Sequence, residues 1–104
     1  MEIQEIDAKT AVQQIEEGAI LVDVREDHEV EEISYDVKHF MHIPLGELPT
    51  RFQEIPKDKN IIMACRSGAR SMRAAQFLAV EGYSEIVNLK AGILGWVENG
   101  MATK

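Results

Sequence analysis

A chain of 104 residues, 45% hydrophobic and 28% charged, is typical of one globular domain, which we expect to span residues 1–104. Its formal net charge of −7 argues against nucleic acid and anionic membranes as partners. Without a signal peptide, an apolar run of membrane-spanning length or a second cysteine for a disulfide, the protein is expected to be cytoplasmic.

The first third of the chain alternates apolar runs with amphipathic segments. Residues 3–6 are a candidate edge strand, and Asp7 is a suitable N-cap for a helix that ends at Gly18. The near-continuous apolar run at 20–24 predicts a strand buried on both faces, as in parallel sheets. A short helix capped by Asp27 follows. The solvated face of this helix is expected to hold three acidic residues, Glu29, Glu31 and Glu32.

The same alternation continues through the rest of the chain. In chain order it predicts an edge strand at 41–43 stopped by Pro44, a helix over 48–55, a strand at 61–64, a helix from Met72 to Gly82, a strand at 85–89 and a last helix over 93–100. Strands that alternate with helices indicate an α/β sandwich with a mainly parallel sheet.

The only cysteine directly follows the strand at 61–64 and begins a loop that leads into a helix. Ligands of open α/β sheets bind at the carboxyl ends of the strands, and amides at the start of a helix point at a bound anion. Gly68 supplies the position that tolerates a positive φ in such a loop. Between Lys59 and Val80 the chain holds four cationic residues and no acidic one, so we predict a basic anion-binding loop on an acidic protein.

This loop is expected to ionise the thiol of Cys65. A helix N-terminus favours an anion by ~0.3–1 kcal/mol, which lowers a pKa by less than about one unit. A larger decrease requires nearby cations, and Arg66 and Arg70 flank the glycine. Cys65 is therefore a candidate nucleophile. The alternative, a buried free cysteine that packs as a small hydrophobic residue, leaves the two arginines and the glycine unexplained.

Two charged residues lie at the end of the strand at 20–24. Because parallel strands share one carboxyl edge, Asp23 and Arg25 should lie near the cysteine loop. The favoured interpretation is an ion pair that holds this edge together, and direct contact with a substrate is the alternative.

The loop sequence resembles the active-site loop of rhodanese-like sulfurtransferases. It lies between an apolar strand and an Ala-rich helix and reads Cys65-Arg66-Ser67-Gly68-Ala69-Arg70-Ser71. Three other stretches agree in the same order, namely Leu21 to Glu26, Ile43 to Leu45, and Asn88 through Gly92 to Trp96. The chain departs from the family pattern at residues 35–40, where the family has a glycine-containing turn before Ile43.

The resemblance implies a three-layer α/β/α sandwich with about five strands, in which the cysteine loop follows the fourth strand. It implies a catalytic Cys65 that carries sulfur as a persulfide, and a supporting role for Asp23 and Arg25. The substrate-binding positions would be the rest of the loop, Arg66, Ser67, Gly68, Ala69, Arg70 and Ser71.

The implied partners are a small anionic sulfur donor, such as thiosulfate, and a nucleophilic acceptor, which is cyanide, a thiol or a protein. The implied reaction is the transfer of the outer, sulfane sulfur between them. No cofactor is expected. A metal site is not expected either, because His39 and His42 lack a second pair of ligands at metal-binding spacing.

Two other functions remain open. A cysteine-based phosphatase needs five residues between its cysteine and an arginine that binds two phosphate oxygens. Here that position is Ser71 and the arginine is Arg70, so the loop is smaller and suits a sulfur atom attached to Cys65. A sulfur carrier, which docks on a partner protein with little turnover, needs the same thiol, and ping-pong kinetics would favour the enzyme over the carrier.

Overall fold

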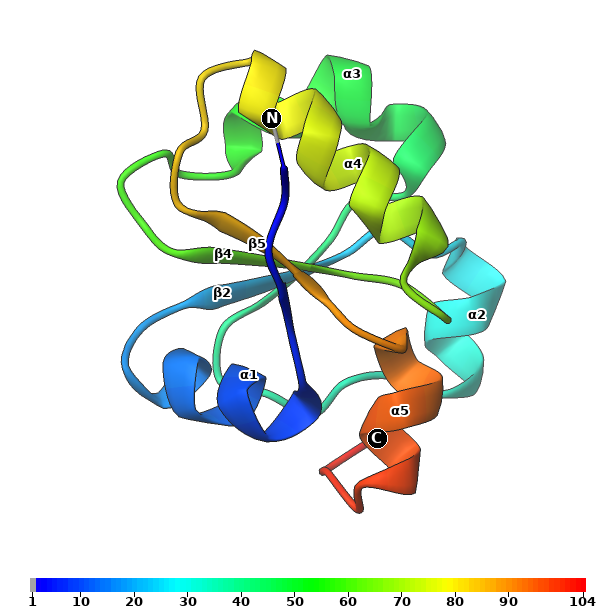
Figure 1. The fold of residues 1–104 in the computed structure, drawn as a ribbon. Coiled ribbons are helices and arrows are strands. Elements are labelled where there is room, and N and C mark those ends of the chain that lie inside the picture. Colours follow the sequence, from blue (N-terminus) through cyan, green and yellow to red (C-terminus); the bar gives the residue numbers. More distant parts are fainter. Residues whose placement is uncertain (1) are drawn as a thin grey trace.

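The computed structural model describes residues 2–104, which form one five-stranded sheet. Every strand pair in it is parallel. The strands lie in the order β1-β5-β4-β2-β3 and are β1 (Glu5–Ile6), β2 (Ile20–Asp23), β3 (Phe40–His42), β4 (Ile61–Ala64) and β5 (Ile86–Leu89). Strand β4, the fourth in the chain, lies in the middle of the sheet (Figure 1). The predicted parallel sheet of about five strands is confirmed, and Cys65 directly follows its central strand.

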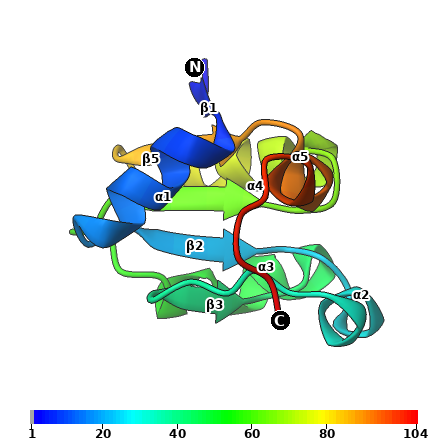
Figure 2. The same cartoon turned by 90° about the horizontal axis from the view of Figure 1, so that it is seen from below.

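Helices cover both faces of the sheet and complete a three-layer sandwich. They are α1 (Ala8–Glu16), α2 (Asp27–Glu32), α3 (Leu48–Arg51), α4 (Ala69–Val80) and α5 (Gly92–Glu98). Helices α3 and α4 lie on one face, and α1 and α5 lie on the other (Figures 1 and 2). Helix α2 lies beside the sheet, near the start of α4 (Figure 1). No helix within residues 2–104 has the length and apolar character to cross a membrane.

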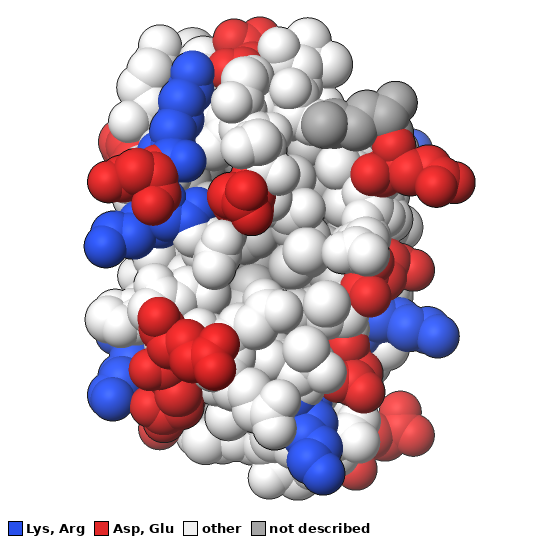
Figure 3. Space-filling view, turned by 60° about the vertical axis from the view of Figure 1, so that its left-hand side comes forward, with Lys and Arg blue, Asp and Glu red and all other residues white. Residues whose placement is uncertain are grey.

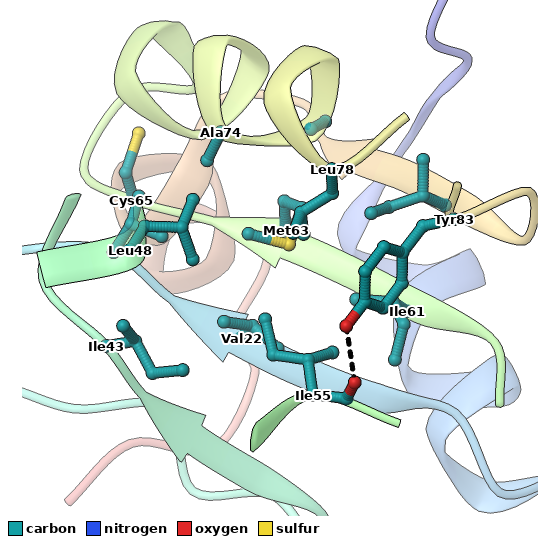
Figure 4. Packing of buried hydrophobic residues seen from close by; sticks show 13 residues of the cluster. Val22, Ile43, Leu48, Ile55, Ile61, Met63, Cys65, Ala74, Leu78 and Tyr83 are labelled. Carbon is teal, nitrogen blue, oxygen red and sulfur yellow. Dashed lines mark hydrogen bonds between the residues drawn. The ribbon is translucent and has the colours of Figure 1, made fainter. Parts of the chain in front are cut away.

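Alternation along β4 distributes its side chains between two hydrophobic clusters. Ile61 and Met63 belong to the cluster under α4, whereas Ile62 and Ala64 belong to the cluster on the α1 and α5 side. Successive side chains of a strand point to opposite faces, so Cys65 continues the row of Ile61 and Met63. In Figure 4 its sulfur points toward the first turn of α4 and away from Ile43.

Several element boundaries differ from the sequence-based expectations: β3 lies at Phe40–His42 rather than 41–43, and α4 begins at Ala69 rather than Met72. The predicted N-cap of α1 is confirmed, because Asp7 accepts a hydrogen bond of 2.8 Å from the Thr10 N–H. Helix α2 is capped by Glu26 rather than Asp27, because Glu26 and Glu29 form a reciprocal capping box. The expected helix over 48–55 is only one turn of α-helix, preceded by a 3₁₀ turn at Leu45–Glu47 and followed by another at Phe52–Glu54. Strand β1 is limited to Glu5–Ile6, instead of the expected residues 3–6.

Residues 34–36, which overlap the start of the stretch that departs from the family pattern, pair with the last three residues of the chain. The N–H of Ser34 donates to the carbonyl of Lys104 over 2.9 Å, and the reverse bond measures 3.0 Å. Between them lies the antiparallel bridge of Tyr35 with Thr103. The ring of Tyr35 is fully buried and packs edge to face against Trp96, with 5.2 Å between the ring centroids. This segment therefore closes the cluster on the α1 and α5 side before the chain enters β3.

The strands begin on the side of the molecule that comes forward in Figure 3. Acidic and basic side chains are interspersed there around an uncharged middle. The cysteine loop lies at the other ends of the strands, so this face is separate from the candidate site.

Candidate active site

Main-chain N–H groups surround the sulfur of Cys65. The Gly68 N–H donates to Sγ over 3.1 Å and the Ser71 N–H over 3.4 Å. Gly68 is the N-cap of α4 and has a φ of 105°, a left-handed value that glycine adopts without strain. Its conformation bends the loop back so that the first turn of α4 faces the sulfur. The structure thus brings together the predicted elements of an anion-binding loop.

The start of α5 packs directly on this loop. The N–H groups of Ile93 and Leu94 donate to the carbonyls of Cys65 and Arg66 over 3.0 and 3.2 Å. A Cβ atom on Gly92 would lie 2.4 Å from the Arg66 carbonyl oxygen and 2.5 Å from that of Cys65. Only glycine allows the two backbones to approach this closely, so α5 holds the loop in place.

The surroundings of Cys65 favour its thiolate. Burial raises the pKa of the thiol, but hydrogen bonds from the Ser71 side chain and from the N–H groups of Ser71, Gly68 and Ser67 together bring the pKa below its ordinary value. These donors belong to the backbone and to one hydroxyl. Neither loop arginine is among the main causes of the lowered pKa of Cys65, although the charge of Cys65 contributes to the raised pKa of Arg70.

Cys65 is only 1% exposed. This burial agrees with the alternative of a cysteine that packs as a small hydrophobic residue, and Cys65 does extend the cluster under α4. An inert buried thiol, however, has a raised pKa, whereas the donors around this one lower it. The sulfur therefore lies in an enclosed polar site at the edge of an apolar core.

The two loop arginines have different surroundings. Arg70 forms two hydrogen bonds with the Glu29 carboxylate, of 2.7 and 2.9 Å, and this guanidinium lowers the pKa of Glu29 to about 2. The interpretation of Glu29 as a solvent-facing residue is wrong, because its side chain is 19% exposed and joins α2 to α4. Arg66 is exposed and, within residues 2–104, forms no salt bridge.

A depression beside the loop has a volume of about 240 Å³. Arg66 and Leu94 line it together with the end of β2 and residues of α2. A larger cavity of about 510 Å³ lies between α1 and the C-terminal residues, where Trp96 and Met101 line it. That cavity is on the α1 and α5 side, away from the face of the sheet that carries Cys65. We therefore associate the smaller depression, which holds a free guanidinium, with the candidate site.

Asp23 and Arg25 form a fully buried ion pair, as the favoured interpretation states. The shortest contact between guanidinium and carboxylate is 2.8 Å, and Arg25 also donates to the Ile33 carbonyl over 2.9 Å. Asp23 lies opposite Ala64 in the sheet register, one residue before Cys65. The pair therefore fixes α2 and the end of β2 next to the cysteine loop.

Two residues at the site were not predicted from the sequence. The Tyr35 hydroxyl donates to the carbonyl of Cys65 over 2.7 Å. The Asn88 side chain, which is fully buried, bonds the Gly68 carbonyl and the Ser71 hydroxyl. An asparagine at an inward position of an otherwise apolar strand is a detectable signal, since a buried amide must find partners. Tyr35 lies in the divergent stretch and carries no such signal.

The described residues hold no group of three or more His, Cys, Asp or Glu side chains that could bind a metal ion. The ring of His42 instead lies 2.7 Å from the Arg25 carbonyl through Nε2. His42 therefore contributes to the edge that Asp23 and Arg25 stabilise.

The fold and the loop define an α/β protein with one cysteine enclosed by main-chain N–H groups. Residues 7–99 match the family described as "Rhodanese-like domain", and the chain belongs to this family. A protein of Allochromatium vinosum named sulfurtransferase is 35% identical over 101 residues, which are 95% of this chain and 92% of that protein.

Solved structures agree with this assignment. The crystal structure of a rhodanese-related protein from Thermoplasma volcanium has a TM-score of 0.87 and 30% sequence identity, and the match covers 97% of each chain. The polysulfide-sulfur transferase of Wolinella succinogenes has a TM-score of 0.86 at 25% identity, with 98% of this chain and 78% of that chain covered. The predicted rhodanese-like fold is therefore confirmed.

Proposed function

We propose that the protein is a sulfurtransferase that carries sulfane sulfur as a persulfide on Cys65. The observation that supports this most directly is the hydrogen bonding of Sγ to the N–H groups of Gly68 and Ser71, which lowers the pKa of the thiol. A thiolate is the nucleophilic form of cysteine, so no separate general base is required. A free thiol of this kind suits a reducing compartment such as the cytoplasm.

In the first step the Cys65 thiolate attacks the outer sulfur of a donor such as thiosulfate. A new S–S bond forms between Sγ and that sulfur, the S–S bond of thiosulfate breaks, and sulfite leaves with the electron pair. The negative charge of the resulting persulfide is held by the loop N–H groups, which already point at Sγ. The exposed guanidinium of Arg66 attracts the anionic donor to the depression beside the loop.

In the second step a nucleophilic acceptor attacks the outer sulfur of the persulfide. The acceptor forms a bond to that sulfur, and the Cys65 thiolate leaves with the electrons of the old S–S bond. The outer sulfur lies about 2.05 Å beyond Sγ, so an acceptor does not need to reach the buried atom itself. Cyanide serves as acceptor in an assay, and a small thiol or a protein thiol serves in the cell.

Sulfur loading tests this proposal directly. After incubation with thiosulfate, intact-mass measurement should show a gain of one sulfur atom, with release of sulfite. Added cyanide should remove the extra mass and yield thiocyanate. The Cys65→Ser variant should stay at its original mass. The assignment would be overturned if the mass of the wild type stayed unchanged both with thiosulfate and with polysulfide as donor.

Two other roles are separated by further measurements. Ping-pong kinetics with thiosulfate and cyanide indicate an enzyme, whereas stable loading with slow turnover indicates a sulfur carrier. Polysulfide is a second donor to test, because the Wolinella succinogenes protein is named a polysulfide-sulfur transferase. Hydrolysis of an aryl phosphate without sulfur uptake would indicate a phosphatase, although Ser71 occupies the position where that chemistry needs arginine.

A further inference from the structure

Asn88 is a fully buried polar side chain next to the cysteine loop. It lies on β5, and its amide contacts three different segments of the chain. Nδ2 lies 3.0 Å from the Gly68 carbonyl oxygen and 3.0 Å from the Glu5 carboxylate, while Oδ1 lies 2.5 Å from the Ser71 hydroxyl. Both Gly68 and Ser71 also donate their N–H groups to the Cys65 sulfur. Asn88 therefore contacts the two residues that hold the sulfur.

The chemistry of these partners fixes the direction of each hydrogen bond. A backbone carbonyl and a carboxylate can only accept, so they must face the NH₂ group of Asn88. Its oxygen then faces Ser71, and an amide oxygen can only accept. The Ser71 hydroxyl consequently donates its proton to Asn88, and its lone pairs are left for other contacts.

Ser71 has only one hydroxyl proton, and three acceptors lie around it: Asn88 Oδ1 at 2.5 Å, the Gly68 carbonyl oxygen at 3.3 Å and the Cys65 sulfur. The bond to Asn88 is short in this structure. The Ser71 side chain is also among the donors that lower the pKa of Cys65. The proton cannot serve Oδ1 and Sγ at the same time, so the position of the hydroxyl must depend on the charge of the sulfur.

We propose that Asn88 is a positioning residue that controls the Cys65 thiolate through Ser71. When the sulfur is neutral, Asn88 holds the Ser71 proton. When the sulfur is negatively charged, as thiolate or persulfide, the hydroxyl rotates and donates to the sulfur instead. No covalent bond changes in this switch. Its consequence for turnover rests on the proposed sulfur transfer, but its effect on the thiol does not.

Each comparison below changes Ser71 alone, within one Asn88 background, because a change of Asn88 also removes the hydrogen bond that Glu5 accepts from it. Several charged or titratable groups surround the loop on all packed elements and are the same in both variants of such a pair. They are Glu5 on β1, Asp23 and Arg25 at the end of β2, Glu29 on α2, Tyr35 below the loop, and Arg66 and Arg70 within it. Their contribution to the pKa of Cys65 is therefore common to every pair of variants compared below.

The test is a set of double-mutant cycles with the thiol pKa as readout, taken from the pH dependence of the ultraviolet absorbance of the thiolate, with Cys65→Ser as the blank. Ser71→Ala is made in the wild type, in Asn88→Ala and in Asn88→Asp. Removing the hydroxyl should raise the pKa of Cys65 most in Asn88→Ala, where only the weaker Gly68 carbonyl acceptor, 3.3 Å from the hydroxyl, still competes with the sulfur. The rise should be intermediate in the wild type and smallest in Asn88→Asp, because a carboxylate binds the proton more strongly. The difference between the extremes should be about one unit, or tenfold in thiolate at a given pH.

Equal effects of Ser71→Ala in all three backgrounds would overturn the proposal, because a purely structural or purely electrostatic role of Asn88 cancels in each cycle. Either Asn88 variant alone completes a cycle, so misfolding of one does not remove the test. Ser71→Thr, which keeps the hydroxyl, should restore the wild-type pKa. Asn99→Ala is a matched control, since Asn99 also donates to a glycine carbonyl, that of Gly95 at 2.7 Å, but away from the loop. The pKa of Cys65 should be unchanged in the Asn99→Ala variant.

The cycles also separate this proposal from the proposed function. The thiolate absorbance reports on the thiol whether or not sulfur is transferred. If coupling is seen but neither thiosulfate nor polysulfide adds mass, the sulfurtransferase assignment fails and the role of Asn88 stands. If sulfur loads onto Cys65 but no coupling is seen, the proposed role of Asn88 fails and the sulfurtransferase assignment stands.

Discussion

Two kinds of positive partner lie around Cys65: main-chain N–H groups that donate to its sulfur, and the guanidinium of Arg70 on α4. The sequence shows four cationic residues in this window and no acidic one, which suggested that arginines ionise the thiol. The structure places the carboxylate of Glu29 on Arg70, from a helix 41 residues earlier in the chain. This pairing offsets the charge of Arg70, and no pattern within the loop reveals it.

The ion pair of Glu29 and Arg70 makes stability depend on pH. Arg70 holds the pKa of Glu29 at about 2 in the folded protein, below the ordinary value of 4.5. A lowered folded-state pKa stabilises the protein above the ordinary value, and this contribution is lost as the pH falls from 4.5 toward 2. We expect Glu29→Gln to reduce the free energy of unfolding by about 1 kcal/mol at neutral pH, since the bidentate pair is only partly buried.

Urea unfolding at neutral pH and near pH 3 measures this effect. The difference between Glu29→Gln and the wild type should shrink at the lower pH, where the wild-type carboxylate loses its advantage. Glu32→Gln, an exposed residue of the same helix, serves as control and should change little. A difference that stays constant across this range would contradict the assigned pKa.

At the scale of elements, the contact between the cysteine loop and the start of α5 is the tightest constraint on the site. Gly92 has a φ of 51°, and any side chain there would meet the backbone of Cys65 and Arg66. Gly92→Ala should therefore destabilise the protein by at least about 2 kcal/mol. Loading with thiosulfate should also fall, because the loop must move to make room. Urea unfolding and intact mass measure the two effects.

Two other changes calibrate the loss of stability expected for Gly92→Ala. Gly46→Ala should have a near-zero effect, because a Cβ atom there meets nothing within 4 Å and the φ of Gly46 is not positive. Ala91 has a φ of 64°, a strained value for a residue with a side chain, so Ala91→Gly should stabilise the protein by up to about 1 kcal/mol. An unchanged stability in Gly92→Ala would show that the loop is free to move away from α5.

The succession of strands along the chain, and the place of the cysteine, could be predicted at this scale because β2, β4 and β5 coincide with short apolar runs. Element ends were less predictable. The helix over 48–55 was inferred from apolar spacing alone, but Pro49 lies in its first turn and a 3₁₀ turn at Phe52–Glu54 replaces its second half. The cap of α2 depends on a reciprocal contact of Glu26 with Glu29, which competes with the simpler cap at Asp27.

At the scale of the whole molecule, the sheet separates two hydrophobic clusters that should unfold together. Trp96 reports on the cluster of α1 and α5, and Cys65 reports on the cluster under α4. Both residues are 1% exposed. Because β4 contributes alternate side chains to both clusters, we expect the fluorescence of Trp96 and the alkylation of Cys65 to give the same urea midpoint. If Cys65 became exposed at a lower urea concentration than Trp96, the loop and α4 would open first.

The sequence indicated this overall architecture, since alternating strands and helices have few ways to pack. It did not indicate how residues 34–36 and the last three residues join. Their pairing is antiparallel, involves a single bridge and has no periodicity that marks it. The same segment supplies the Tyr35 hydroxyl that holds the carbonyl of Cys65, so part of the site depends on contacts that only the folded chain defines.

The enclosure of Sγ also limits which molecules can react with it. A slender electrophile such as thiosulfate needs less room to reach the buried thiolate than a bulky disulfide does. Two copies of the chain cannot bring their Cys65 sulfurs to the ~2.05 Å of a disulfide bond while each is only 1% exposed. The fold thus protects its thiol from cross-linking between copies, a safeguard that a solvent-facing cysteine would lack.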